Sequence, residues 1–304
     1  MEGKHIIFIL LFVFIILYLY INKKESFDYC RKIAKEQAGN FYLTFHLLPK
    51  LKSDSMCALY AFMRISDDIA DEPGEINFTR KALGIWRDQT LGALNGQFSH
   101  PIHPAFALMV QRHQIPHQYL LDVLDGVEMD LDIHRYQTFD ELYKYCYRVA
   151  SAVGLCCIHL WGFNSEKALL PAESAGIALQ LTNILRDIKE DYARGRIYLP
   201  QEDMVKFDYD EIKLKNEVRD ERFFNLLDFQ AKRAAKYYEQ ARELTQYLDG
   251  NARGIFLAML HTYKAILDKM QKNNFDLFND RVRIGTFQKL CLLAKYLPYS
   301  WKSS

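Results

Sequence analysis

The amino-acid sequence predicts an all-α protein, in which a single N-terminal transmembrane helix precedes one helical domain. Apolar residues recur at helical spacing through long segments of the 304-residue chain, as in helices that pack on a common core. We find no convincing run of alternating apolar and polar residues of the kind that marks strands, and no βαβ unit. We therefore expect a membrane anchor over residues 1–24 and one all-α domain over residues 25–304.

The anchor is an apolar run from Ile6 to Ile21 that contains no charge, glycine or proline. As a helix it would be roughly 24 Å long at ~1.5 Å per residue, and flanking tyrosines and lysines extend it to the interface. A cleaved signal peptide is the alternative, but no small residues with cleavage-site spacing follow the run. Lysines and arginines are more numerous after the run than before it, which predicts a single-pass protein in membrane lipid with its domain in the cytosol.

Charge and motifs exclude several classes of function for the body of the chain. Lysine plus arginine (39) nearly balances aspartate plus glutamate (38), so no overall electrostatic field favours nucleic acid as a partner. We also expect the protein to be a monomer. The six cysteines form no CxxC pair, which is typical of reduced packing thiols. No Ser/His/Asp set, HExxH, Walker loop or GxGxxG motif is present, so nothing supports covalent, zinc, P-loop or Rossmann chemistry.

The first candidate site residues lie on a segment that Pro73 helps to end. On a helix, Asp67 and Asp71 are neighbours one turn apart, and Arg64 and Tyr60 fall on the same stripe. Two carboxylates at this spacing repel each other, more strongly if the site is partly buried. The pattern therefore predicts a cation at this face.

The second candidate segment extends from Gln180 to Pro200 and is interpreted as one helix that begins near Pro171 and stops before Gly195. A polar stripe on this helix is flanked by leucines and isoleucines that pack into the core, and its members are Gln180, Asn183, Asp187 and Asp191. Arg186, Arg194 and Arg196 supply positive charge nearby.

An isolated acidic stripe is more often a solvated helix face than a site. Two such stripes, each with a carboxylate pair and an arginine, favour a polyphosphate bound through Mg²⁺, which takes few carboxylates and fills its octahedron with phosphate oxygens and water. The ion acts as a Lewis acid on the leaving diphosphate, while arginines and lysines neutralise the charge that collects as the C–O bond breaks. The chemistry expected at such a site is formation of an allylic carbocation.

The sequence resembles the squalene/phytoene synthase family over nearly the whole body. The resemblance rests on an ordered set of segments: residues 40–49, residues 58–71, Gly126-Val-Glu-Met-Asp130, Tyr145-Cys-Tyr-Arg-Val-Ala-Ser-Ala-Val-Gly154 and residues 180–200. It implies the isoprenoid-synthase helical bundle with a central cavity. The implied reaction is Mg²⁺-dependent, head-to-head condensation of two prenyl diphosphates.

The resemblance also implies roles for individual residues. Its metal–diphosphate ligands match Asp67, Asp71, Asn183, Asp187 and Asp191, with Gln180 in support, and diphosphate contacts match Tyr60, Arg64, Arg196, Tyr198, Tyr263 and Arg281. The walls of the prenyl tunnels match Phe41, Phe45, Tyr145, Val149, Ala150, Val153 and Gly154. Taken singly, such residues more often belong to an ordinary hydrophobic core than to a tunnel wall.

The residue sequence of both aspartate motifs resembles squalene-type enzymes and so favours two molecules of farnesyl diphosphate as substrates. These would be joined to form presqualene diphosphate, which would then be converted to squalene or dehydrosqualene. A phytoene synthase that uses two geranylgeranyl diphosphates is the alternative within this chemistry. A non-catalytic assembly factor of the same fold is the alternative in another class, and the retained aspartates argue against it. NADPH would be a further cofactor if squalene is the final product, although no nicotinamide-binding motif is recognisable.

Overall fold

The computed structural model describes residues 22–38, 40–45, 47–279, 281–285, 287–288, 291–292 and 294–296. This described part is helical and has no strand beyond two isolated bridges, which pair Arg135 with Ile197 and Phe163 with Leu248. The predicted all-α class is therefore confirmed. Contacts divide the chain into two compact units, residues 1–115 and 116–304, and one domain over residues 25–304 stays a prediction.

The predicted transmembrane helix falls on residues 6–21, which lie outside the described residues. Among the helices that the structure does describe, none combines the length and the apolar character needed to cross a membrane. The single-pass anchor therefore stays a prediction from the sequence.

The first unit is built on α3 (Lys50–Asp71), which contacts α2 (Asn40–Phe45), α4 (Ile76–Leu94) and α5 (His103–His113). In its core, Phe62 stacks on Phe106 with ring centroids 4.8 Å apart, and both side chains are almost fully buried. The backbone leaves α3 at Glu72, the residue before Pro73, because a residue that precedes proline is driven out of the α region. The sequence thus ends α3 directly after the first pair of aspartates.

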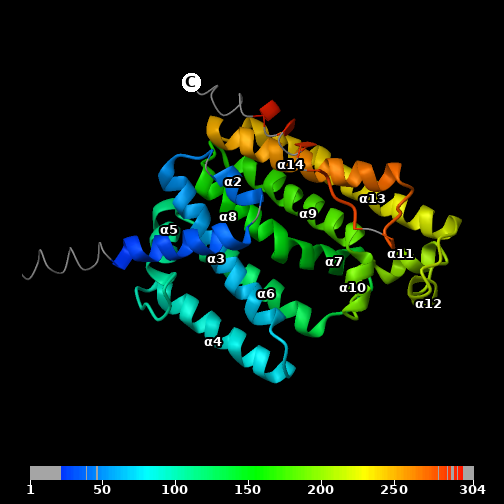
Figure 1. Ribbon diagram of the computed structural model, residues 1–304, viewed down its shortest axis with the longest axis horizontal. Helices are drawn as coiled ribbons and strands as arrows, with labels where there is room; N and C mark the ends of the chain where they lie inside the picture. Colours follow the sequence, from blue (N-terminus) through cyan, green and yellow to red (C-terminus); the bar gives the residue numbers. More distant parts are fainter. Residues whose placement is uncertain are drawn as a thin grey trace, which may run out of the picture. The chain divides into compact units, whose positions relative to one another are not determined.

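The second unit surrounds α9 (Leu169–Arg186), which contacts α8 (Ala152–Trp161), α13 (Glu221–Arg242) and α14 (Gly250–Lys272) and lies between them in Figure 1. Its other α-helices are α6 (His117–Asp132), α7 (Phe139–Cys146), α10 (Ile188–Ala193), α11 (Gln201–Lys206) and α12 (Glu211–Lys215). Small residues let α9 approach its neighbours closely. An added Cβ at Gly176 would lie 2.4 Å from the Cα of Ser151, so only glycine fits there.

A π-helical segment, η1 (Tyr147–Ser151), joins α7 to α8, and the three form one continuous helix. Its wider turn is closed by the backbone N–H of Ala152, which donates to the carbonyl of Tyr147. Segments of this kind insert one extra residue into a turn and occur often at functional sites. Here the segment lies inside the Tyr145–Gly154 motif.

Candidate active site

Asp187 lies where α9 ends and α10 begins. The predicted single helix over this region is wrong, because the backbone leaves regular helical geometry at Asp187, with φ −104° and ψ 15°. Two hydrogen bonds nevertheless keep the spacing of the polar stripe: the N–H of Asp187 donates to Asn183 and the N–H of Asp191 donates to Asp187, each over 2.8 Å. The break turns the carboxylate of Asp187 toward two arginines.

Arg186 and Arg281 both form two hydrogen bonds with the carboxylate of Asp187. Arg281 donates from Nε to Oδ1 and from Nη2 to Oδ2, each over 2.8 Å, and Arg186 donates to the same two oxygens over 2.7 and 2.5 Å. Burial by itself would raise the pKa of this carboxyl group, but the hydrogen bonds from the two arginines outweigh burial and lower the pKa. Asp187 is therefore held as an anion.

Asp191 has the opposite electrostatic environment. Burial, and next the negative charge of Asp187, raise the pKa of its carboxyl group to about 7, and Arg196 only partly offsets them. A carboxylate in this position gains most from a bound proton or a bound cation. At neutral pH Asp187 is thus fully ionised, while Asp191 is only partly ionised.

The stripe continues into a cavity of about 220 Å³ between η1, α8, α9 and α14. Many of the predicted substrate-binding residues line it together: Val149, Ala150, Val153, Gly154, Gln180, Asn183 and Tyr263. The remaining walls are apolar and include Trp161 and Phe256. The cavity therefore offers a hydrocarbon-lined space with polar groups from the acidic stripe at its edge.

Tyr145 and Tyr198 meet at a carboxylate that the sequence analysis did not select. Their hydroxyls donate to Asp130 over 3.1 and 2.9 Å, their rings stack with centroids 5.0 Å apart, and the guanidinium of Arg196 donates to the backbone carbonyl of Asp130 over 3.2 Å. Burial raises the pKa of both phenols. Asp130 thus positions both predicted tyrosines and is among the charges that raise the pKa of Asp191.

The first acidic segment lies on α3, in the other unit. Asp67 and Asp71 are exposed at its C-terminal end, and Arg64 forms an ion pair with Asp68. Burial raises the pKa of the Tyr60 phenol, and the neighbouring Arg64 partly offsets this rise. Arg64 also has a buried Nε without a hydrogen-bond partner among the described residues. The predicted facing of the two acidic stripes involves both units and stays a prediction.

Of the two predicted tunnel residues in the first unit, Phe45 is buried, with 6% of its surface exposed. The side chain of Phe41 lies outside the described residues. Their role in a prenyl tunnel therefore stays a prediction.

Comparison with known families identifies the family of this chain. Residues 34–288 match the family described as squalene/phytoene synthase. The chain belongs to the squalene/phytoene synthase family. This confirms the resemblance inferred from the sequence motifs.

Similar proteins in the squalene/phytoene synthase family include phytoene synthases as well as dehydrosqualene and squalene synthases. The 15-cis-phytoene synthase of Synechococcus elongatus is 37% identical over 88% of this chain and 91% of its own, and the phytoene synthase of Arthrospira platensis is 38% identical over 90% and 92%. A crystal structure of a dehydrosqualene synthase superposes with a TM-score of 0.83 at 31% identity, over 92% of this chain and 98% of that one. A squalene synthase from Alicyclobacillus acidocaldarius, at 22% identity and a TM-score of 0.80 over 85% and 97%, supports the fold alone.

Donor chemistry at the second acidic segment fits the Mg²⁺ ion expected for a squalene/phytoene synthase. The Oδ1 atom of Asn183 is buried and accepts no hydrogen bond within the described chain, and an orphaned oxygen of this kind is suited to a hard cation. No group of three or more histidine, cysteine, aspartate or glutamate side chains in the described chain could hold an ion by itself. The residues thus fit an ion that takes most of its ligands from a diphosphate and water.

Sequence reasoning assigned no role to Asp130, although it closes the Gly126–Asp130 motif of the squalene/phytoene synthase family. Its importance depends on two tyrosines that are 15 and 68 residues away in the chain. A signal was present, since a carboxylate two residues from the end of α6, inside a recognised motif, needs a partner if it is buried. The identity of that partner became visible only in the fold.

We expect the Asp130→Ala variant to lose roughly 2–3 kcal/mol of unfolding free energy, because two buried hydroxyls would lose their acceptor. The measurement is urea denaturation. Asp130→Asn retains an acceptor oxygen and should lose less than Asp130→Ala. Equal stability of the alanine variant and the wild type would contradict the positioning role of this carboxylate.

Proposed function

We propose that the protein condenses two molecules of geranylgeranyl diphosphate head to head to form phytoene, with Mg²⁺ as cofactor. The observation that carries this proposal is the 37–38% identity to phytoene synthases over about nine-tenths of both chains. This favours the alternative of the sequence analysis over its preference for farnesyl diphosphate. Dehydrosqualene synthesis from farnesyl diphosphate is the second candidate, supported by the dehydrosqualene synthase structure at 31% identity.

The residues of the second unit support ionisation of a prenyl diphosphate. Mg²⁺, when bound, supplies Lewis-acid stabilisation of the leaving diphosphate. Asp191 and the Oδ1 atom of Asn183 offer oxygen ligands, while Arg186, Arg281 and Arg196 place positive charge beside the stripe. These side chains hold the reacting end of the substrate in a charged region, which lowers the cost of collecting negative charge on the leaving group.

The 220 Å³ cavity serves the hydrocarbon end of the substrate. Its apolar walls exclude water from the allylic cation, and each buried CH₂ group contributes roughly 0.8 kcal/mol to binding. Aromatic side chains such as Trp161 and Phe256 present faces that attract a cation without reacting with it. The final cation is quenched by proton loss, so product formation requires no reductant.

The deciding experiment is incubation of the purified protein with Mg²⁺ and either geranylgeranyl or farnesyl diphosphate, with and without NADPH, followed by mass analysis of the extracted lipids. We expect a C40 product from geranylgeranyl diphosphate whose amount does not depend on NADPH and which disappears with EDTA. A C30 product formed faster from farnesyl diphosphate would establish the second candidate instead. Consumption of neither substrate by folded protein would support the non-catalytic assembly factor.

We also propose that residues 1–24 anchor the enzyme in a membrane with its catalytic part in the cytosol. The uncharged apolar run supports this, and a C40 hydrocarbon product has no aqueous destination. The test is membrane fractionation of the full chain and of a chain that starts at Asn22. Equal recovery of both chains in the soluble fraction would contradict the anchor.

A further inference from the structure

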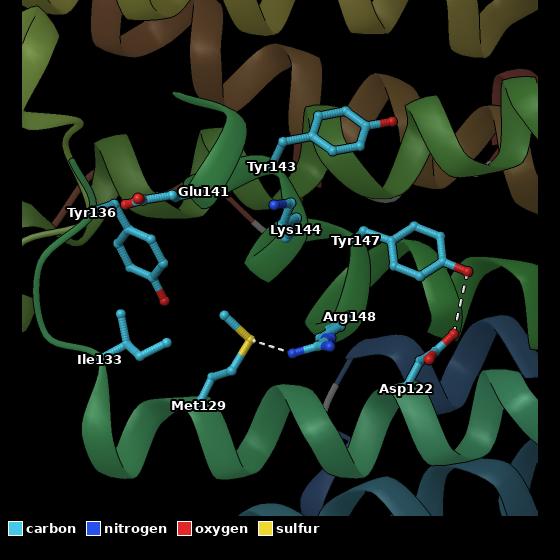
Figure 2. Close-up of a pocket in the computed structure, with 9 residues that line it drawn as sticks. All are labelled: Asp122, Met129, Ile133, Tyr136, Glu141, Tyr143, Lys144, Tyr147 and Arg148. Carbon is cyan, nitrogen blue, oxygen red and sulfur yellow. Dashed lines mark hydrogen bonds between the residues drawn. The ribbon is translucent and has the colours of Figure 1, made fainter. Parts of the chain in front are cut away.

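A second cavity, of about 410 Å³, lies between α6, α7 and η1 and is separate from the site described above. The two cavities have no lining residue in common. This second cavity borders the opposite side of the same helix, because Tyr143, Lys144, Tyr147 and Arg148 line it while Val149, Ala150 and Val153 line the first. Its volume lies within the range of ordinary small-molecule sites. Figure 2 shows the side chains around it.

Arg148 brings a guanidinium with weak partners into this cavity. Its Nη1 atom donates to the thioether sulfur of Met129 over 3.2 Å, and its Nη2 atom lies 3.9 Å from the carboxylate of Asp125. A thioether is a poor acceptor for a charged donor, and an ion pair at this distance between partly exposed groups contributes little. Most of the anion-binding capacity of Arg148 therefore remains available.

Two more donors converge on the same space. The side chain of Lys144 is exposed and forms no ion pair among the described residues. Tyr136 is 1% exposed, and its hydroxyl is buried without a hydrogen-bond partner in the described chain. Figure 2 shows this hydroxyl pointing toward Met129 and Ile133. A buried phenol without a partner is costly, so a ligand acceptor there would be stabilising.

The two carboxylates that line the cavity carry negative charge, but they lie to either side of its cationic donors (Figure 2). Asp122 accepts a hydrogen bond from the hydroxyl of Tyr147 over 3.3 Å, and Glu141 accepts one from the backbone N–H of Gln137 over 2.7 Å. In Figure 2 these two carboxylates lie at opposite ends of the view, with Lys144 and Arg148 between them. The available donors thus occupy the middle of the cavity.

We propose that this cavity is a second ligand site, which binds an organic phosphate that carries a short hydrocarbon group. Three donors of different geometry suit the several acceptor oxygens of a phosphate, and an arginine can engage two of them at once. Met129 and Ile133 supply the apolar surface for the hydrocarbon group. Binding requires neither the acidic stripe nor Mg²⁺.

An occupant of the cavity would contact the tyrosine cluster of the candidate active site through Tyr136. The ring of Tyr136 stacks on Tyr198 with centroids 5.9 Å apart and lies 5.5 Å from the ring of Tyr145. Those two tyrosines donate to Asp130. The site is therefore placed to sense or adjust the catalytic network, although it is distinct from it.

The test uses methyl NMR of the full chain labelled with ¹³C-methyl methionine, in EDTA, with dimethylallyl monophosphate as the probe. The chain has 8 methionines, and the Met129 signal is assigned by its loss in Met129→Leu. We expect a saturable shift of this signal, with affinity reduced about tenfold in Arg148→Gln, since a charge-assisted hydrogen bond is lost. The matched control is Lys236→Gln, which neutralises an exposed lysine on α13 and should bind like the wild type.

Two further arms test the parts of the proposal separately. The uncharged alcohol of the probe and inorganic phosphate should each bind at least about fivefold more weakly, because each lacks one half of the recognised group. Tyr136→Phe should weaken binding about threefold without lowering the melting temperature, since its hydroxyl has no partner to lose. No shift at Met129, equal binding of the alcohol, or unchanged affinity in Arg148→Gln would overturn the proposal. Because the assay contains no Mg²⁺ and no turnover, its failure would leave the proposed synthase activity untouched.

Discussion

Replacing Asp191 by asparagine should abolish most of the synthase activity and at the same time stabilise the fold. We expect kcat to fall at least about 100-fold, because a charged oxygen is removed from the region where we propose that the diphosphate and Mg²⁺ bind. Asparagine has nearly the same shape, and it does not carry the charge that burial and Asp187 disfavour at this position.

The stability gain should depend on pH in a defined way. The folded-state pKa of Asp191 is about 7, well above the ordinary value of 3.8, so between these two pH values the folded chain holds a proton that the unfolded chain has released. The unfolding free energy contributed by this group therefore falls as pH rises through that window and is lowest above pH 7. Asp191→Asn should accordingly raise the melting temperature more at pH 8 than at pH 5.

Differential scanning calorimetry at the two pH values and steady-state kinetics measure the two effects. Asp228→Asn is the matched control, because Asp228 is a surface residue of α13 that pairs with Lys232; it should leave kcat unchanged. An Asp191→Asn protein that is less stable than the wild type at pH 8 would show that the carboxylate is satisfied by its surroundings. Full activity of Asp191→Asn would show that Asp191 is not one of the proposed Mg²⁺ ligands.

The largest loss of stability is expected for Gly176→Ala. The new Cβ would lie 2.4 Å from the Cα and 2.5 Å from the backbone nitrogen of Ser151, and neither helix can yield without moving its own hydrogen-bonded turns. We expect a loss of more than about 3 kcal/mol of unfolding free energy, at the upper end of overpacking effects. Urea denaturation followed by circular dichroism provides the measurement.

Two other glycines make the comparison specific. Gly84, inside α4, has nothing within 4 Å of an added Cβ, so Gly84→Ala should stabilise the protein by about 0.5–1 kcal/mol through helix propensity. Gly154→Ala places its Cβ 3.4 Å from the carbonyl oxygen of Ala172, an ordinary contact, and should fold normally. A Gly176→Ala protein as stable as the wild type would show that α9 and η1 do not approach as closely as described.

Much of this molecule could be predicted from the sequence because helical periodicity and helix breakers act locally. Pro73 ends α3 directly after Asp71, and the residues of the Tyr145–Gly154 motif meet Gln180 and Asn183 around one cavity. The family was also within reach, since its motifs are contiguous in the chain. The choice between a C30 and a C40 product was not within reach, because product choice depends on the three-dimensional shape of a cavity.

Features that depend on distant partners escaped prediction. The break at Asp187 coincides with the grip of Arg281, which is 94 residues further along the chain. Asp130 gains its role from two tyrosines outside its own helix, and Tyr136 had no motif to single it out. A local pattern identifies which face of a helix is polar, but not which group arrives opposite that face.

The π-helical segment η1 has a consequence for insertions and deletions. Because it inserts one extra residue between Tyr145 and Gly154, the length of this stretch is as much a determinant of the site as its composition. The wider turn absorbs that residue, so the flanking halves keep their faces, and positions five apart rather than four take the same place on the helix across the segment. Deleting one residue from Tyr147–Ser151 would let the chain close into a regular α-helix, and it would remove the widened turn without turning the two halves. A deletion elsewhere in the helix has no such turn to absorb it and would rotate one half by about 100° relative to the other. A shortened variant therefore tolerates a lost residue at this segment in a way that the regular turns beside it do not.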